Sequence, residues 1–362
     1  MLQLVFGRSG YGKTEYIRNR IADMIDRGET QVLLITPEQY SFISEYSLLE
    51  QLGEARAHAV RCLSFSRLCD ECDRLYGADG RKPLTKGGKA ILMKTAIDQV
   101  RPDLELFEKK GSSAAFVQSM TGIYDEMKSC NLSGAAVYAA ADDLDTDILR
   151  CKMRDFSRIM TAYEALLGDR FADPANRLTR LYDQIKDQNY FAGQTVFLDG
   201  FNGFVAQEYK ILERIIAEAK AVYIALDSDS FGMGDGYDLF AYVNETAGIL
   251  QRIADKAGVP TNALQLSENC RTDYADLRRV EQYIFADQAP ETEIPAEHIR
   301  LYAASTVTDA CNDLALQIKG LLRCGYRAGE IAVTMRDREK YAPVLASAFE
   351  KYGVPYYADE RQ

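Results

Sequence analysis

The chain has 362 residues, 47% of them hydrophobic, and 54 Asp and Glu against 43 Lys and Arg give a formal net charge of −11 at pH 7. A chain of this length usually folds around more than one hydrophobic core, and the hydrophobic fraction excludes a disordered chain. The acidic balance argues against strong independent binding of nucleic acid. No apolar run reaches the ~18 residues of a membrane span, so no membrane partner is expected.

The first 80 residues alternate between strand-like and helix-like patterns. The apolar runs and helical spacings predict strands at 2–6, 32–36 and 59–64, and helices at 15–27, 38–52 and 65–76. Alternation of strand and helix is typical of a parallel α/β sheet.

The pattern changes between residues 85 and 188, where strand-like runs disappear. Helical spacing recurs at 90–100, 114–130, 149–167 and 176–188, with Gly and Pro between the runs. The α/β pattern then resumes, with strands at 195–198 and 221–226 and helices at 207–219 and 245–257. After an acidic, proline-containing segment at 287–295, strands at 299–304 and 331–335 alternate with helices at 309–324 and 341–352.

Three domains are predicted from this order. Residues 1–80 and 190–290 form a first α/β domain, which residues 81–189 interrupt as an all-helical insertion. Residues 296–362 begin a second α/β domain. Its two or three strands are too few for a sheet of their own, so we expect the chain to be the N-terminal piece of a longer protein.

Eight cysteines are scattered along the chain, and its first residues lack the basic and long apolar segments of a secretion signal. Reduced thiols in the cytoplasm are therefore expected. Cys69 and Cys72 form a lone C-x-x-C on a predicted helix. A zinc site needs two further ligands at suitable spacing, so packing is favoured over metal binding.

The strongest motif follows the first predicted strand and opens the first helix. Gly7, Arg8, Ser9, Gly10, Tyr11, Gly12, Lys13 and Thr14 match G-x-x-x-x-G-K-[ST]. Glycines let backbone N–H groups surround phosphate oxygens, Lys13 would reach the β- and γ-phosphates, and the Thr14 hydroxyl would hold Mg²⁺. The alternative is a glycine-rich turn that matches by chance. The strand–loop–helix context favours a P-loop NTPase (RecA-like) fold that takes ATP and Mg²⁺.

Such a loop needs an acid at the end of a neighbouring strand to hold the metal. Asp199, after the strand at 195–198, has the right position; it could instead only cap that strand, and Asp227 and Asp229 are weaker candidates. The residue after Asp199 is Gly200. Many ATPases with a phosphate loop carry a glutamate at this position, which polarises water. Slow or absent hydrolysis is expected unless Glu208 or another carboxylate substitutes.

The whole arrangement resembles superfamily 1 helicases of the UvrD/RecB type. The segments that carry the likeness are LITPEQ at 34–39, CLSFSRL at 62–68, NCRT at 269–272 and IAVTMRD at 331–337. The likeness implies that Arg271 contacts the γ-phosphate. It also implies that the candidates for DNA contact are Thr36, Tyr40, Ser64 and Phe65. Basic residues at 81–94, Lys82 and Lys86 among them, could contact a DNA backbone or simply be solvated.

A closer likeness is to the AddB family, which supplies one of the two chains of bacterial AddAB helicase–nucleases. GRSGYGKT, TPEQYSF, LSFSRL, LDGFNGF and YGVPYYAD carry it. The resemblance implies a partner of the AddA motor that processes double- and single-stranded DNA ends during break repair and is associated with Chi recognition. It also implies nuclease carboxylates and an iron–sulfur cluster in a C-terminal domain beyond residue 362.

Two departures from an active helicase affect the expected activity. Gly200 lacks the motif glutamate, and residues 226–229 (LDSD) lack the glutamine that couples nucleotide to DNA. Phosphate binding is therefore expected, and autonomous motor action is not. The alternatives are an active P-loop ATPase or translocase, and a scaffold that binds DNA or a partner without hydrolysing nucleotide.

Overall fold

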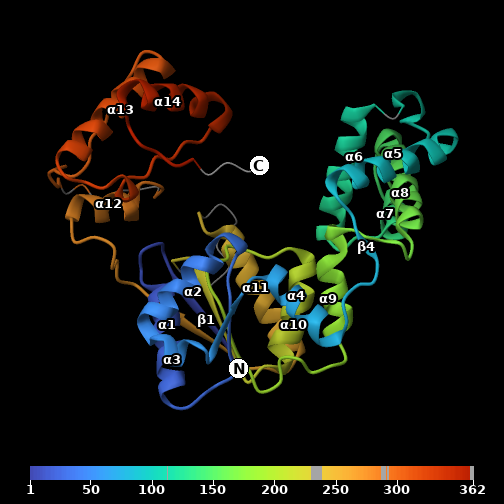
Figure 1. Ribbon diagram of the computed structural model, residues 1–362, viewed down its shortest axis with the longest axis horizontal. Coiled ribbons are helices and arrows are strands. Elements are labelled where there is room, and N and C mark those ends of the chain that lie inside the picture. Colours follow the sequence, from blue (N-terminus) through green and yellow to red (C-terminus); the bar gives the residue numbers. More distant parts are fainter. Residues whose placement is uncertain (112, 230–238, 287–290, 292, 359–362) are drawn as a thin grey trace. The chain divides into compact units, whose positions relative to one another are not determined.

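The computed structural model (Figure 1) describes residues 1–111, 113–229, 239–286, 291 and 293–358. These residues fall into two compact units, Met1–Thr272 and Asp273–Gln362. Helix α12 (Ala275–Tyr283) therefore lies in the second unit, although the sequence grouped residues up to 290 with the first domain. The three-domain division stays a prediction. No helix among the described residues is both long and apolar enough to cross a bilayer.

The first unit is built on one parallel sheet of six strands in the order β3-β2-β6-β7-β1-β8. The strands are β1 (Leu2–Gly7), β2 (Val32–Ile35), β3 (Val60–Leu63), β6 (Thr195–Leu198), β7 (Ala221–Asp227) and β8 (Thr261–Gln265). This sheet and its helices confirm the predicted α/β, RecA-like class. Strand β7 separates β1 from β6, and its register places Asp227 opposite Gly7.

Side-chain alternation along the strands explains why both faces of the sheet are covered. Leu33 and Ile35 enter one core, whereas Val32 and Leu34 enter the core on the opposite face. Figure 1 shows the two helical layers. One layer holds α1 (Lys13–Asp26), α2 (Glu38–Leu52) and the short α3 (Glu54–Ala57); the other holds α4 (Phe65–Tyr76), α9 (Arg177–Ile185), α10 (Ala206–Glu218) and α11 (Ala241–Lys256).

Strand β8 was not predicted from the sequence. Its residues TNALQ are half-buried or exposed and lack a clear apolar alternation. The strand exists because it pairs with β1 from Leu2 to Phe6 at the edge of the sheet. Its formation is therefore a tertiary effect rather than a local one.

The helical part between β3 and β6 has its own core, with Tyr124 and Tyr163 in edge-to-face contact at 4.7 Å. Its helices are α5 (Lys86–Val100), α6 (Ala114–Ser129), α7 (Gly134–Ala141) and α8 (Asp147–Leu167). Three short 3₁₀ turns (Arg101–Asp103, Glu108–Lys110 and Pro174–Asn176) and a two-residue pair, β4 (Lys82–Pro83) with β5 (Phe171–Ala172), complete it. Helix α9 packs instead into the core of the sheet, through Leu181 and Ile185.

The second unit contains α12, α13 (Val307–Arg323), a 3₁₀ turn (Ala328–Glu330) and α14 (Arg338–Tyr352). Cys311, Ala315, Leu345 and Phe349 join α13 and α14 in a small core. The strands predicted at 299–304 and 331–335 are not formed, so that part of the expectation for a second α/β domain is wrong for these residues. A strand needs a neighbour to satisfy its backbone groups, and neither run has a ladder partner among the described residues.

Candidate nucleotide-binding site

The glycine-rich loop lies between β1 and α1 and depends on two left-handed glycines. Gly10 has φ 90° and Gly12 has φ 80°, a region that glycine enters without steric cost. The N–H of Cys270 donates to the Gly10 carbonyl at 2.9 Å. A Cβ atom on residue 10 would lie 3.0 Å from the Cβ of Arg271. Glycine therefore lets the 270–271 segment close over the loop.

Lys13 is held on the inner side of this loop. Its ammonium donates to the carbonyls of Gly7 at 2.7 Å and Arg8 at 2.9 Å. It also lies 2.5 Å from Oδ1 of Asp227, at the end of β7. The adjacent strands β1 and β7 thus bring a cation and a carboxylate together where the loop begins.

The predicted metal ligands, Thr14 and Asp199, lie close together beside the loop. Asp199 follows β6 and is 9% exposed, and the Thr14 side chain hydrogen-bonds its carboxylate. Burial raises the pKa of Asp199, although hydrogen bonds from Thr14 and the Gly200 N–H and the charge of Lys13 oppose that shift. A hydroxyl and a carboxylate are the hard oxygen donors that Mg²⁺ prefers, so the residues present fit this ion.

A cavity of about 380 Å³ opens beside these groups. It is lined by Ser9, Gly10, Gly12, Lys13, Thr14, Glu15, Arg18, Asp199, Gly200, Phe201, Ala225, Asp227, Cys270 and Arg271. Four separate parts of the sequence therefore meet here: the loop with the start of α1, the end of β6, the end of β7, and the segment after β8.

The other three members of the motif support the loop rather than line the cavity. Gly7 ends β1, Tyr11 is 8% exposed, and Arg8 pairs with Asp229 at 2.9 Å. Sequence reasoning missed Arg18 and Cys270. The signal for Arg18 was present, because it follows Thr14 by four residues and so shares its helical face.

Gly200 adopts a left-handed conformation with φ 81°. A Cβ atom there would lie 3.4 Å from Cδ of Pro37 and 3.6 Å from Cδ2 of Tyr40. The space beside residue 200 is thus bounded by the start of α2, and a side chain would also require an unfavourable backbone conformation.

Glu208, the predicted substitute base, does not line the cavity. Its carboxylate accepts the Val205 N–H at 2.9 Å at the start of α10, and burial raises its pKa. A carboxylate that satisfies an otherwise free helix-end donor has a structural reason to be there. The other carboxylates at the cavity are Glu15, Asp199 and Asp227.

The DNA-contact candidates divide by exposure. Thr36, Ser64 and Phe65 are 1%, 2% and 6% exposed, and the Ser64 hydroxyl caps α4 by accepting the Arg67 N–H at 3.2 Å. Tyr40 is 48% exposed. Lys82 and Lys86 are exposed as well, so three of the six candidates are accessible in this structure.

The C-x-x-C pair lies inside the core of the first unit. Cys69 and Cys72 are 1% and 0% exposed, and burial raises their pKa values to about 11 and about 12. Across the described residues, no three His, Cys, Asp or Glu side chains are grouped to hold a metal. Both thiols pack in this core.

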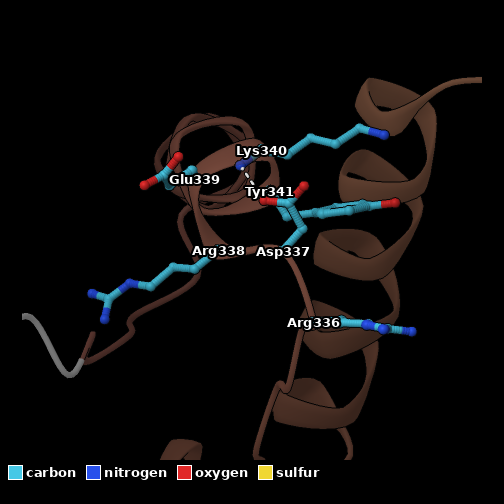
Figure 2. A pocket seen from close by; sticks show the side chains of 6 residues that line it. All are labelled: Arg336, Asp337, Arg338, Glu339, Lys340 and Tyr341. Atoms are coloured by element: carbon cyan, nitrogen blue, oxygen red, sulfur yellow. Dashed lines mark hydrogen bonds between the residues drawn. The ribbon is translucent and has the colours of Figure 1, made fainter. Parts of the chain in front are cut away.

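A second hollow, of about 590 Å³, lies at the start of α14 in the second unit (Figure 2). Figure 2 shows the side chains of Arg336, Arg338 and Lys340 pointing in different directions. Asp337 caps the helix by accepting the Lys340 N–H at 3.0 Å. These charged groups do not converge on a common point, so their arrangement does not indicate a binding site.

Comparison with known proteins agrees with this geometry. The family model described as ADDB, N-terminal, matches residues 4–281. The chain belongs to the AddB family. Among similar proteins are those named as the B subunit of an ATP-dependent helicase/deoxyribonuclease from Clostridioides difficile (strain 630), 28% identical over 377 residues, and from Clostridium novyi (strain NT), 26% identical over 366 residues.

These two matches cover 100% and 99% of this chain but only 32% of each relative. A protein of the same name from Thermoanaerobacter sp. (strain X514) is 25% identical, and the match again covers 32% of that relative. The chain thus spans about a third of the length of the curated relatives it matches.

Proposed function

We propose that this AddB-family chain is the nucleotide-binding, helicase-like N-terminal part of one component of a heterodimeric ATP-dependent helicase–nuclease. It would work with the AddA motor on double- and single-stranded DNA ends in recombinational break repair, including Chi-dependent processing. Any nuclease carboxylates and iron–sulfur cluster would belong to the part of the relatives that this chain does not cover. The proposal rests on the family membership and the names of the relatives.

The observation that best supports a nucleotide site is the convergence of Lys13, Thr14 and Asp199 on one cavity. The loop backbone and Lys13 would hold the phosphates of ATP, with Arg271 close to the last of them. Thr14 and Asp199 would hold Mg²⁺, which supplies charge neutralisation between the phosphates.

The surroundings of Gly200 support binding without efficient hydrolysis. A glutamate at this position would orient water for attack, but residue 200 has no side chain and is bounded by Pro37 and Tyr40. Glu208 caps α10 instead. We therefore propose a site that binds Mg-ATP as a structural or regulatory ligand and does not drive DNA movement alone.

Titration with a fluorescent ATP analogue, with and without Mg²⁺, tests the site directly. We expect Mg²⁺-dependent binding that Lys13→Ala abolishes, because the lysine charge is lost from the loop. Absence of binding at millimolar concentrations would leave the alternative of a scaffold with a vestigial loop. DNA-stimulated hydrolysis that Lys13→Ala removes would instead identify an active translocase.

DNA binding is a second and separate test. Exposed Lys82 and Lys86 are the accessible basic candidates, and the chain as a whole carries a net charge of −11. Weak, salt-dependent binding is expected, since it would rest on contacts to DNA phosphates. Tight binding at ~200 mM salt would contradict the need for surfaces supplied by a partner.

A further inference from the structure

Arg18 lines the nucleotide cavity from helix α1, one turn after Thr14. Its position follows from the helical repeat, because residues four apart share a face. Long side chains on a helix also lean toward its N-terminus, which directs Arg18 back over the turn that carries Thr14. Gly200 and Phe201 line the same cavity.

The Arg18 side chain has one buried nitrogen without a partner. Its Nε atom is buried and has no hydrogen-bond partner. Four other arginines also have a buried, unpaired Nε, but each pairs with a carboxylate through another nitrogen: Arg101, Arg154, Arg180 and Arg214. Arg18 forms no such ion pair with any residue that the structure describes.

Three cations and three carboxylates line the cavity, and among the described residues Lys13 is the cation of these that has a carboxylate partner. Lys13 pairs with Asp227, and Asp199 interacts with Thr14. Arg18 and Arg271 remain without a carboxylate partner within the described parts of the chain, although both line the cavity. An unpaired, partly desolvated guanidinium is costly unless a ligand supplies the negative charge.

We propose that Arg18 is a specificity-determining residue that contacts the terminal phosphate of a nucleoside triphosphate and makes the site prefer the triphosphate over the diphosphate. The inference rests on the proposed nucleotide site. Arg18 lines the cavity from helix α1, four residues after Thr14, whereas Arg271 approaches the loop at Gly10. The guanidinium groups of Arg18 and Arg271 would thus approach the terminal phosphate of the nucleotide from two separate chain segments.

The experiment is titration of the chain with Mg-ATP and Mg-ADP analogues, comparing wild type with Arg18→Gln. A charge-assisted contact to one phosphate predicts about a tenfold loss of ATP affinity with little change for ADP. Arg18→Lys retains the charge and should recover part of the preference. Arg20→Gln is the matched control, because Arg20 lies on the same helix with its guanidinium on the Tyr223 ring and hydroxyl.

Equal losses for ATP and ADP, or no loss for either, would overturn the role of Arg18, since a merely structural residue does not change the ratio of the two affinities. Failure of the wild-type chain to bind either nucleotide would instead overturn the proposed nucleotide site itself. Thermal unfolding of Arg18→Gln without nucleotide separates a folding defect from a binding defect.

Discussion

The ammonium of Lys13 lies 2.5 Å from Oδ1 of Asp227, so the lysine expected to hold phosphates is engaged by a carboxylate before any nucleotide arrives. Asp227 is 43% exposed at its side chain, and a pair with this much solvent contact is worth at most ~1 kcal/mol. A bound nucleotide must therefore take the place of Asp227 as the partner of Lys13.

Asp227→Asn is therefore expected to raise Mg-ATP affinity a few-fold, because Lys13 becomes free and a negative charge leaves the cavity. Titration with a fluorescent ATP analogue measures the change. Asp26→Asn is the control, since Asp26 pairs with Arg56 at the end of α1 and neither residue lines the cavity. A loss of affinity in Asp227→Asn would show that this carboxylate helps to hold the metal.

Gly200→Glu is expected to destabilise the chain and to confer no ATP hydrolysis. A side chain at φ 81° costs about 1 to 3 kcal/mol, and the new carboxylate would lie beside Pro37 and Tyr40. Urea unfolding and a phosphate-release assay measure the two effects. Gly258→Glu, with φ 68° and no atoms within 4 Å of a Cβ, controls for backbone strain alone. Gain of hydrolysis would show that the missing glutamate was the only defect.

Asp173→Ala is expected to reduce the free energy of unfolding by about 3 kcal/mol, because it leaves a buried charge with poorer pairing. Lys89 donates to Asp173 at 2.8 Å, and the Tyr163 hydroxyl donates to the same carboxylate at 2.6 Å. The control Asp183→Ala breaks an exposed pair with Lys186, for which a change below ~1 kcal/mol is expected. Similar losses of unfolding free energy in both variants would mean that the hydrogen bonds and ion pair of Asp173 contribute little to stability.

Cysteine labelling should separate buried from exposed thiols. The pKa of Cys69 is raised to about 11 by burial, so at pH 8 only ~1 thiol in 1,000 is the reactive thiolate. Its labelling in the folded chain should rise as the pH increases toward that value. Cys130 and Cys270 are exposed and should react readily at pH 8. Mass spectrometry after iodoacetamide treatment reads each site.

Nucleotide should protect Cys270 selectively, because this thiol lines the cavity and lies 3.7 Å from the place of a Cβ on Gly12. Cys130, in the helical part, serves as the internal control and should keep its rate when Mg-ATP is added. Unchanged labelling of Cys270 at saturating nucleotide would argue against occupation of this cavity.

The sequence by itself determined the elements whose cause is local. The G-x-x-x-x-G-K-T spacing specifies the phosphate loop, since glycine conformations and the start of a helix depend on neighbouring residues. The buried apolar runs at 32–35 and 195–198 likewise specified central strands, and the position of Asp199 after the second of them placed it at the edge of the sheet.

Only the tertiary structure decided which distant side chains meet. Tyr40 bounds Gly200 because β2 lies beside β6, and Arg271 lies over Gly10 because β8 lies beside β1. These strands are parallel, so their carboxyl ends meet at the same edge of the sheet. Strand β8 formed through its partner β1, whereas the runs at 299–304 and 331–335 lacked one among the residues described. Strand pairing and side-chain convergence depend on neighbours that are far away in the chain, and a local pattern does not encode them.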